Sequence, residues 1–246
     1  MKYLTSVYWE RGSEAEQNQD SLVVLQVVTA KGRVLLAAVC DGMGGESHGE
    51  KASGYVTQRL QEWFYESLLR AVQRKKAYWI IRRSLDRLAY DMQEQLSRYA
   101  KKEEIRMGTT MTVLVLWERT YLLWHLGDSR VYRLGAFRKG KTDCDRAVCM
   151  TTDHVRGSNQ LTKCVGSFRY ERPDFVMGTI KEGQAFLMCS DGFRNRIDSQ
   201  EIYDALNPGT VKEEEQASRR LREIGVTCMK RGEKDNMSAI YIKAVK

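Results

Sequence analysis

Five aspartates stand at the ends of apolar segments, where carboxylates could bind metal ions. Asp41, Asp128 and Asp191 directly follow apolar runs, and Asp20 and Asp235 stand just before others. A carboxylate at the end of a buried strand is costly to keep charged unless a cation or a hydrogen-bond donor compensates it. Asp-Gly is also an ordinary turn dipeptide, which explains any one of these positions. Five such positions are harder to explain this way, so we interpret them as a candidate metal site.

The chemistry of these side chains narrows the choice of metal. The set contains only carboxylates and no His or Cys. Oxygen ligands alone point to a hard cation such as Mg²⁺ or Mn²⁺. Two such ions that share bridging carboxylates can activate a water and clamp a phosphoryl oxygen. The residues by themselves therefore indicate phosphoester hydrolysis.

Strand-like segments are needed to position the aspartates. Two β-rich runs, 22–28 and 33–40, flank a Lys31-Gly32 turn and predict a hairpin. Asp20 lies near the entry of this hairpin and Asp41 at its exit, so the strand pair can bring both carboxylates to one end of a sheet. The other segments expected to form strands are 2–9, 109–117, 121–126, 131–134, 148–151, 185–189 and 238–245.

The runs 109–117 and 121–126 predict a second hairpin, and between the two hairpins the apolar period changes to that of helices. Apolar residues recur at helical spacing over 52–64 and 77–99, which predicts two amphipathic helices in an antiparallel layer. We interpret the aromatic residues on these stripes as core, and not as a binding platform. The basic run Arg74-Lys75-Lys76 is interpreted as the solvated connection. Further helices are expected over 199–206 and 211–229, with a short helical turn over 159–166.

The strand patterns also predict the fold class. The runs 34–39, 113–116 and 186–189 are apolar on consecutive residues, which indicates burial on both faces. The order of elements lacks regular βαβ alternation, which disfavours a doubly wound parallel sheet. We expect an α+β fold, a four-layer α-β-β-α sandwich of two mainly antiparallel sheets flanked by helices. With 2 prolines and no linker-like tract, residues 1–246 are expected to form a single domain.

Composition and charge disfavour several other classes of protein. The formal net charge of +8 permits attraction to acidic partners or nucleic acid, but no nucleic-acid-binding motif accompanies it. No apolar run reaches about 18 residues, so no membrane span is expected. The six cysteines show no paired spacing, which disfavours a zinc site and indicates a reducing cytoplasm. Cys40, Cys149 and Cys189 lie in or beside apolar runs and are interpreted as small buried thiols.

Nine short motifs, ordered along nearly the whole chain, resemble the metal-dependent protein phosphatases of the PPM family (the type 2C serine/threonine phosphatases) in their bacterial form. Any one motif is weak, whereas the ordered set is highly specific. The motifs are Asn18-Gln19-Asp20, Asp41-Gly42-Met43-Gly44-Gly45, Gly49-Glu50 with Ala52-Ser53, Gly108-Thr109-Thr110, Gly127-Asp128-Ser129-Arg130, Thr152-Asp153-His154, Asn159 with Leu161-Thr162 and Gly166, Cys189-Ser190-Asp191-Gly192, and Asp235-Asn236.

The resemblance implies a centre with two Mn²⁺ or Mg²⁺ ions at one end of the sandwich. Asp41 would bridge both ions. The Gly42 carbonyl and Asp20 would bind one ion, and Asp191 and Asp235 would bind the other. Asp128 resembles the family's ligand for a third, weaker ion.

The resemblance also implies a mechanism. A hydroxide that bridges the two ions, held through Asp41 and Asp191, would attack the phosphorus of phosphoserine or phosphothreonine in line, with no phosphoenzyme. Asn236 would not bind a metal ion itself but would keep the ligand Asp235 in position. Cys189 is therefore expected to be a core thiol and not a nucleophile.

Several positions depart from the family pattern. Ala15 stands where family members usually carry an arginine that contacts the substrate phosphate, with Arg11 nearby in sequence, and Gln19 replaces an acidic residue. Only Val155-Arg156-Gly157-Ser158 separates two motifs between which bacterial members often have a mobile flap. No substrate-binding residue is therefore assigned.

The general acid is a further departure. Met43 replaces the histidine that some eukaryotic members use to protonate the leaving group. His48 is close in sequence but is interpreted as a surface-loop histidine. The leaving-group proton is therefore expected to come from metal-bound water.

These observations predict a cytoplasmic, monomeric enzyme whose substrate is a protein phosphorylated by a serine/threonine kinase. No nucleic-acid or membrane partner is expected. Two alternatives stay open: a low-activity or pseudo-phosphatase that binds phosphoproteins, motivated by Ala15 and the short flap, and nucleic-acid binding, motivated by the basic charge. The intact ligand set favours the enzyme, because five carboxylates around an empty site would be electrostatically expensive.

Overall fold

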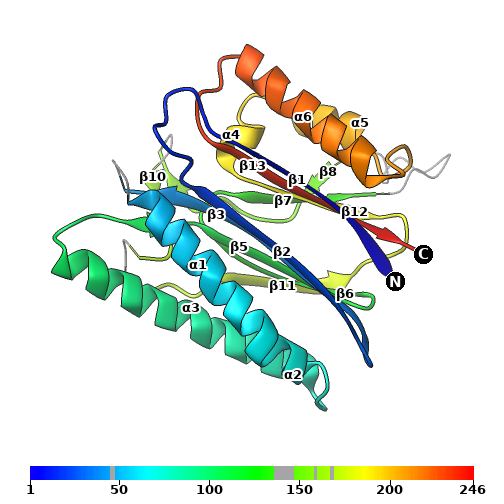
Figure 1. The fold of residues 1–246 in the computed structure, drawn as a ribbon, viewed down its shortest axis with the longest axis horizontal. Coiled ribbons are helices and arrows are strands. Elements are labelled where there is room, and N and C mark those ends of the chain that lie inside the picture. Colours follow the sequence, from blue (N-terminus) through cyan, green and yellow to red (C-terminus); the bar gives the residue numbers. More distant parts are fainter. Residues whose placement is uncertain (45–47, 136–146, 158–159, 167–168) are drawn as a thin grey trace. The chain divides into compact units, whose positions relative to one another are not determined.

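The computed structural model describes residues 1–44, 48–135, 147–157, 160–166 and 169–246, which form two compact units (Figure 1). The five-stranded unit comprises Met1–Asn18, Ser129–Asp153 and Thr179–Lys246, and the six-stranded unit comprises Gln19–Asp128 and His154–Gly178. Gly45 and Asn159, which the motifs above include, Ser158, which stands between two motifs, and Cys144, one of the six cysteines, lie outside the described residues.

The six-stranded unit is built on the predicted hairpins. The pairs β2–β3, β3–β5 and β5–β6 are antiparallel. β3 is therefore hydrogen-bonded on both edges, and it carries Asp41 close to its end. The order in the sheet is β11 (Asp174–Thr179), β6 (Thr120–Leu126), β5 (Met111–Trp117), β3 (Gly32–Met43) and β2 (Asp20–Thr29), and the short β4 (Gly108–Thr109) pairs with the end of β3.

Helices cover one face of this sheet (Figure 1). α1 (Gly49–Trp63) continues through a π-helical segment, η1 (Phe64–Leu68), into α2 (Leu69–Ala71). α3 (Ala77–Lys102) runs beside α1, as the two helical stripes predict. The apolar face of each helix thus packs on the strands that carry the candidate ligands.

Strand β3 is buried along its whole apolar run. All residues from 34 to 40 are 0% exposed. Alternate residues, among them Leu36 and Ala38, belong to the core under the helices, and the residues between them point to the opposite face. The inference that consecutive apolar residues mark a strand covered on both faces is confirmed for β3.

The five-stranded unit is also antiparallel. Helices α4 (Asp191–Arg194), α5 (Ser199–Leu206) and α6 (Glu214–Lys230) pack on its sheet through one apolar cluster. α5 begins with a capping box in which Asp198 and Glu201 bond each other's backbone N–H groups. The strand order is β1 (Lys2–Glu10), β13 (Met237–Val245), β12 (Ala185–Cys189), β7 (Arg130–Leu134) and β8 (Ala147–Cys149).

The predicted fold class is confirmed: the protein is α+β, with two mainly antiparallel sheets flanked by helices. The single domain expected over residues 1–246 stays a prediction. None of the described helices is both long and apolar enough to cross a membrane.

Three element predictions were wrong. Strand β11 was not predicted, because its residues are half-buried or exposed and lack an apolar run. The helical turn expected over 159–166 is instead partly strand, since β10 (Gln160–Leu161) pairs with β9 (Val155–Arg156). The helix expected from residue 211 begins at Glu214, because Val211 is buried in the preceding loop.

Two burial predictions were also wrong. Cys149 is exposed, because β8 is a short edge strand that buries Ala147 and leaves its other residues outside. Tyr99 is 43% exposed, because the last turn of α3 lines a surface groove of about 400 Å³. The buried state of Cys40 and Cys189 and the burial of Trp63 and Phe64 are confirmed.

Candidate metal centre

The first two predicted ligands face each other across a strand pair. Asp20 at the start of β2 is the register partner of Asp41 on β3. Directly opposed residues of an antiparallel pair project from the same face, and like charges there repel. Asp20 is only 3% exposed, and Asp41 is half-buried. A divalent cation between these carboxylates would offset both the repulsion and the desolvation.

Two threonines fix the backbone of Asp41. The Asp41 N–H donates to the Thr110 hydroxyl at 2.9 Å, and the Thr110 N–H donates back to the Asp41 carbonyl at 2.9 Å. The Thr109 hydroxyl donates to the same carbonyl, also at 2.9 Å. These contacts explain why two threonines follow Gly108, and they were not predicted from the sequence.

The first turns of α1 position Asp20 in the same way. The Ser53 hydroxyl donates to the Gln19 carbonyl at 2.6 Å and lies 2.9 Å from the Ser21 hydroxyl. Gly42 must be glycine here, because a Cβ at this position would lie 2.3 Å from the Gly49 carbonyl oxygen. The glycine therefore lets helix α1 begin against the strand that carries the ligands.

His154 makes two hydrogen bonds to the backbone of Gly127, the residue before Asp128. Gly127 has φ +113°, a conformation that favours glycine. Its N–H donates to His154 Nδ1 at 3.1 Å, and the His154 N–H donates to the Gly127 carbonyl at 2.8 Å. Since Nδ1 accepts a hydrogen bond, the ring proton lies on Nε2, which is 3.2 Å from Asp174. Burial, followed by the nearby charge of Lys163, lowers the pKa of His154 below its ordinary value.

The second pair of predicted ligands lies in the five-stranded unit. Asp191 opens α4, and Asp235 precedes β13. Burial raises the pKa of Asp235, and the negative charge of Asp191 raises it further, so the two carboxylates are electrostatically coupled. The buried Asn236 donates its N–H to the Asp235 carboxylate at 2.7 Å. A cation bound beside the two carboxylates would favour their charged forms and would so offset the raised pKa of Asp235.

Close backbone packing brings this second pair together. Ser190 and Ser238 exchange two hydrogen bonds of 3.0 Å, one from each N–H. A Cβ on Gly192 would lie 2.2 Å from the Asn236 carbonyl oxygen, so only glycine allows α4 to approach the start of β13. The glycine of Asp191-Gly192 is therefore needed for close packing of α4, and not only for a turn.

Sequence reasoning missed an ion cluster that joins two of the motifs to helix α4. Arg130 donates to both oxygens of Asp153, at 2.9 and 2.8 Å, and Arg194 donates to one of them at 3.2 Å. The hydrogen bonds to Asp153 raise the pKa of Arg130, so this arginine stays charged. Arg130 and Asp153 stand in the motifs and Arg194 does not, and no pattern in the sequence could show that Asp153 and Arg194, 41 positions apart, are paired.

Four of the predicted carboxylate ligands are therefore found as two pairs, one in each unit, and Asp128 belongs to the six-stranded unit. Within the described residues, no group of three or more His, Cys, Asp and Glu side chains is placed to hold a metal. The donors in each pair are carboxylate oxygens, and this chemistry fits Mn²⁺ or Mg²⁺. Cys189 is fully buried and its pKa is raised to about 12, which fits the prediction that it is not a nucleophile.

The structure also shows the surroundings of the residues at which the sequence departs from the family pattern. The Arg11 guanidinium is exposed and donates to the Glu16 carbonyl at 3.0 Å. Ala15 is half-buried and its N–H lies 3.4 Å from the Gly12 carbonyl. His48, predicted as a surface-loop residue, is half-buried at the N-cap of α1. None of these contacts identifies a phosphate-binding residue.

Comparison with known proteins identifies the family. A family model described as "Protein phosphatase 2C" matches residues 11–227. The chain therefore belongs to the protein phosphatase 2C family, as the motifs predict.

Relatives and solved structures agree with this assignment. Protein phosphatase PhpP of Streptococcus pneumoniae is 24% identical over 211 residues, which cover 81% of this chain and 82% of PhpP. The Streptococcus agalactiae serine/threonine phosphatase structure has a TM-score of 0.78 at 21% identity and covers 100% of both chains. The catalytic domain of the phosphatase PstP in complex with 2 manganese ions has a TM-score of 0.74 at 24% identity and covers 99% of both chains.

Proposed function

We propose that this protein is a metal-dependent protein-serine/threonine phosphatase that hydrolyses phosphoserine and phosphothreonine in proteins. The observation that carries the proposal is the register of β2 and β3, which sets the buried Asp20 directly opposite Asp41. Two carboxylates opposed in this way form a site for a cation. The relatives PhpP and PstP are named as a protein phosphatase and a serine/threonine protein phosphatase, which supports the same activity.

We propose two Mn²⁺ or Mg²⁺ ions as cofactors. Asp20 and the Gly42 carbonyl are the proposed ligands of one ion and Asp191 and Asp235 of the other, with Asp41 as the bridging ligand that the family resemblance implies. Asp128 is the proposed ligand of a third, weaker ion. The manganese ions of the PstP structure support the choice of metal.

The residues around the ligands keep them in place for this chemistry. When bound, the ions would supply a hydroxide nucleophile and neutralise charge on the phosphoryl oxygens. Thr110 holds the Asp41 backbone at both its N–H and its carbonyl. Asn236 bonds Asp235 through its backbone N–H, which keeps that carboxylate oriented. Because these contacts exist before substrate binds, little reorganisation is needed at the moment of reaction.

The test is hydrolysis of a phosphothreonine peptide by the wild type, Asp41→Asn and Asp91→Asn at saturating Mn²⁺. Asp91 lies on α3, where it pairs with Arg87, so its variant is a control for loss of one carboxylate. We expect Asp41→Asn to lose about 100-fold or more in kcat/KM, with Asp91→Asn unchanged. Equal activity of Asp41→Asn and wild type would refute the proposal.

The same assay separates the pseudo-phosphatase alternative. Binding of the phosphopeptide by wild type, with no Mn²⁺-dependent release of phosphate, would establish a binding module in place of an enzyme. Parallel reactions in Mg²⁺ and in Mn²⁺ decide which ion supports turnover. We further propose a phosphoprotein made by a serine/threonine kinase as the substrate, while the monomeric state and the cytoplasmic location stay predictions.

A further inference from the structure

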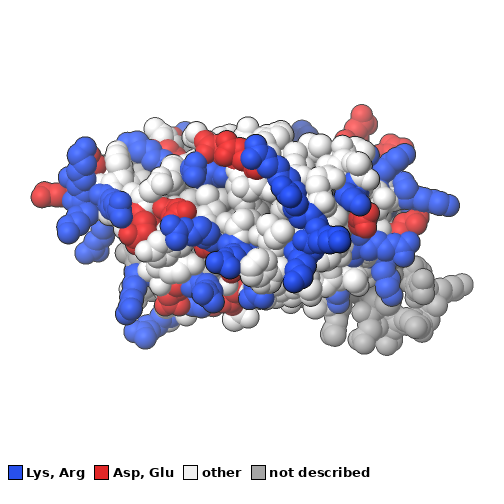
Figure 2. Space-filling view, turned by 90° about the horizontal axis from the view of Figure 1, so that it is seen from below, with Lys and Arg blue, Asp and Glu red and all other residues white. Residues whose placement is uncertain are grey.

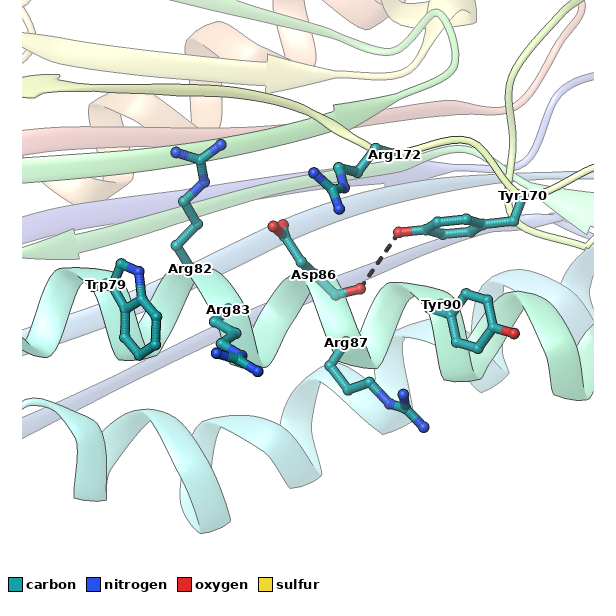
Figure 3. Close-up of a pocket in the computed structure, with 8 residues that line it drawn as sticks. All are labelled: Trp79, Arg82, Arg83, Asp86, Arg87, Tyr90, Tyr170 and Arg172. Atoms are coloured by element: carbon teal, nitrogen blue, oxygen red, sulfur yellow. Dashed lines mark hydrogen bonds between the residues drawn. The ribbon is translucent and has the colours of Figure 1, made fainter.

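A groove on α3 gathers arginines in the six-stranded unit. It has a volume of about 440 Å³, and it is lined by Arg82, Arg83 and Arg87 of α3 and by Arg172 from the segment before β11. Figure 3 shows Arg82 and Arg172 on one side of the helix and Arg83 and Arg87 on the other. Lys and Arg side chains are also prominent in Figure 2, which views the molecule from the side on which α3 lies in Figure 1.

Aromatic rings hold three of these guanidinium groups in place. Arg82 lies over Phe175 at 4.4 Å from the ring centre, Arg83 over Trp79 at 5.3 Å, and Arg87 over Tyr90 at 5.5 Å. A stacked guanidinium loses rotational freedom but keeps its N–H edge for a partner. These three arginines thus have fewer accessible rotamers than unstacked ones, which lowers the entropy lost on binding.

The groove contains one acidic side chain, and that side chain has a structural role. Asp86 accepts a hydrogen bond from Trp124 Nε1 at 3.1 Å, which ties α3 to strand β6. The Tyr170 hydroxyl lies 3.5 Å from the Asp86 carbonyl oxygen, as the dashed line in Figure 3 shows. Arg87 also pairs with Asp91 beside the groove, at 3.1 Å. Four arginines against these two carboxylates leave an excess of positive charge, which suits an anionic partner.

The spacing of the arginines matches an extended peptide. Arg83 and Arg87 are four residues apart on a helix, which is a rise of about 6 Å. Carboxylates two residues apart on an extended chain are separated by about 6.6 Å. The helical part of the groove, from Trp79 to Tyr90, rises about 17 Å, which is the length of about five extended residues.

We propose that this groove binds an acidic segment of a partner protein in extended form, with carboxylates at alternate positions paired to the α3 arginines. The stacking favours this partner over nucleic acid, because guanidinium groups already lie over the rings of Trp79 and Tyr90. Unstacked bases need open aromatic faces. The proposal does not depend on catalysis, so it can fail while the phosphatase activity stands.

The experiment measures binding of a labelled peptide with glutamate at every second position. The variants are the double substitution Arg83→Gln with Arg87→Gln and, as the matched control, Arg219→Gln with Arg222→Gln on the exposed face of α6. Both remove two positive charges from exposed helix positions. We expect the α3 variant to bind about tenfold or more weakly, and the control to bind like wild type. Hydrolysis of the phosphothreonine peptide is expected to be unchanged in both.

Two further arms separate geometry from charge. Arg83→Lys with Arg87→Lys keeps the charge but loses the planar donor fork, so we expect intermediate binding. A peptide of the same composition with its glutamates grouped at one end is expected to bind more weakly than the alternating one. No binding by wild type, equal losses in the α3 and α6 variants, or tighter binding of a single-stranded oligonucleotide or an anionic vesicle would each overturn the proposal.

Discussion

Thr110 is the residue on which the geometry of Asp41 most depends. Its hydroxyl is an acceptor for the Asp41 N–H, and its N–H reaches the Asp41 carbonyl. Thr110→Val keeps the shape but leaves the Asp41 N–H without its acceptor, which costs about 1–3 kcal/mol of folding free energy. We expect Mn²⁺ affinity to fall by about 10-fold or more, because the ligand loses its orientation.

Calorimetric titration with Mn²⁺ and urea unfolding measure these two effects. Thr227→Val is the matched control, because the Thr227 hydroxyl bonds only a carbonyl within α6. Unchanged Mn²⁺ affinity in Thr110→Val would show that this threonine does not position the ligand.

A second prediction concerns the pKa of His154 and its effect on the stability of the fold. Its Nδ1 accepts a hydrogen bond from Gly127, and burial lowers its pKa from 6.5. The folded protein therefore binds this proton less readily than the unfolded chain does. The stability that the neutral ring contributes is present above about pH 6.5 and is lost as the pH falls through the lower folded-state pKa.

An NMR titration of the histidine Cε1–H resonance, assigned with His154→Gln, measures this pKa directly. We expect a value below 6.5, with the Gly127 amide resonance moving in the same titration. A value at or above 6.5 would show that burial does not destabilise the charged ring of His154 in the folded protein.

At the scale of elements, the approach of α4 to β13 sets the distance between Asp191 and Asp235. Gly192→Ala would place a methyl 2.2 Å from the Asn236 carbonyl oxygen. We expect destabilisation by about 2 kcal/mol or more, since backbone atoms must move to relieve the overlap.

Gly54→Ala is the matched control for this substitution. Gly54 lies in α1, and a Cβ there would have nothing within 4 Å. The control is expected to be neutral or stabilising by about 0.5–1 kcal/mol. Urea unfolding of both variants measures the difference, and equal midpoints would exclude a close contact at Gly192.

Elements with strong patterns could be predicted from the sequence. The β2–β3 hairpin and helices α1 and α3 were confirmed because their apolar residues recur at one clear period. Strand β11 was missed because its alternation is weak and its residues are partly exposed. Cys149 was predicted as buried because an apolar neighbour does not reveal that its strand is at the edge of a sheet.

The metal ligands themselves stay a prediction, although the strand ends that carry them were located from the sequence. The carboxylates stand at the ends of strands, so their positions alone indicated a cation. The residues that hold them could not be predicted, because Thr110 is 69 positions from Asp41 and such pairings follow only from the register of the strands. The exposure of aromatic residues on α3 could not be predicted either, because a helical stripe does not show how far the neighbouring layer covers the helix.

At the scale of the whole molecule, metal binding is expected to be linked to stability. A ligand that binds the folded chain at 100 times its Kd adds about 2.7 kcal/mol to the unfolding free energy. We therefore expect Mn²⁺ to raise the melting temperature and EDTA to lower it again. Asp41→Asn and Asp235→Asn should each lose most of this shift, and a full shift in both variants would argue against these ligands.

The strand order of the five-stranded unit has a consequence for synthesis on the ribosome. Among the described strands β1 is made earliest, yet its neighbour in the sheet is β13, which is made latest. The residues of the six-stranded unit are all present once Gly178 has been made, so that unit can fold while translation continues. The nascent chain must keep β1 unpaired until translation reaches β13. Unpaired strands associate readily with other chains, so β1 is exposed to incorrect pairing for as long as β13 is missing.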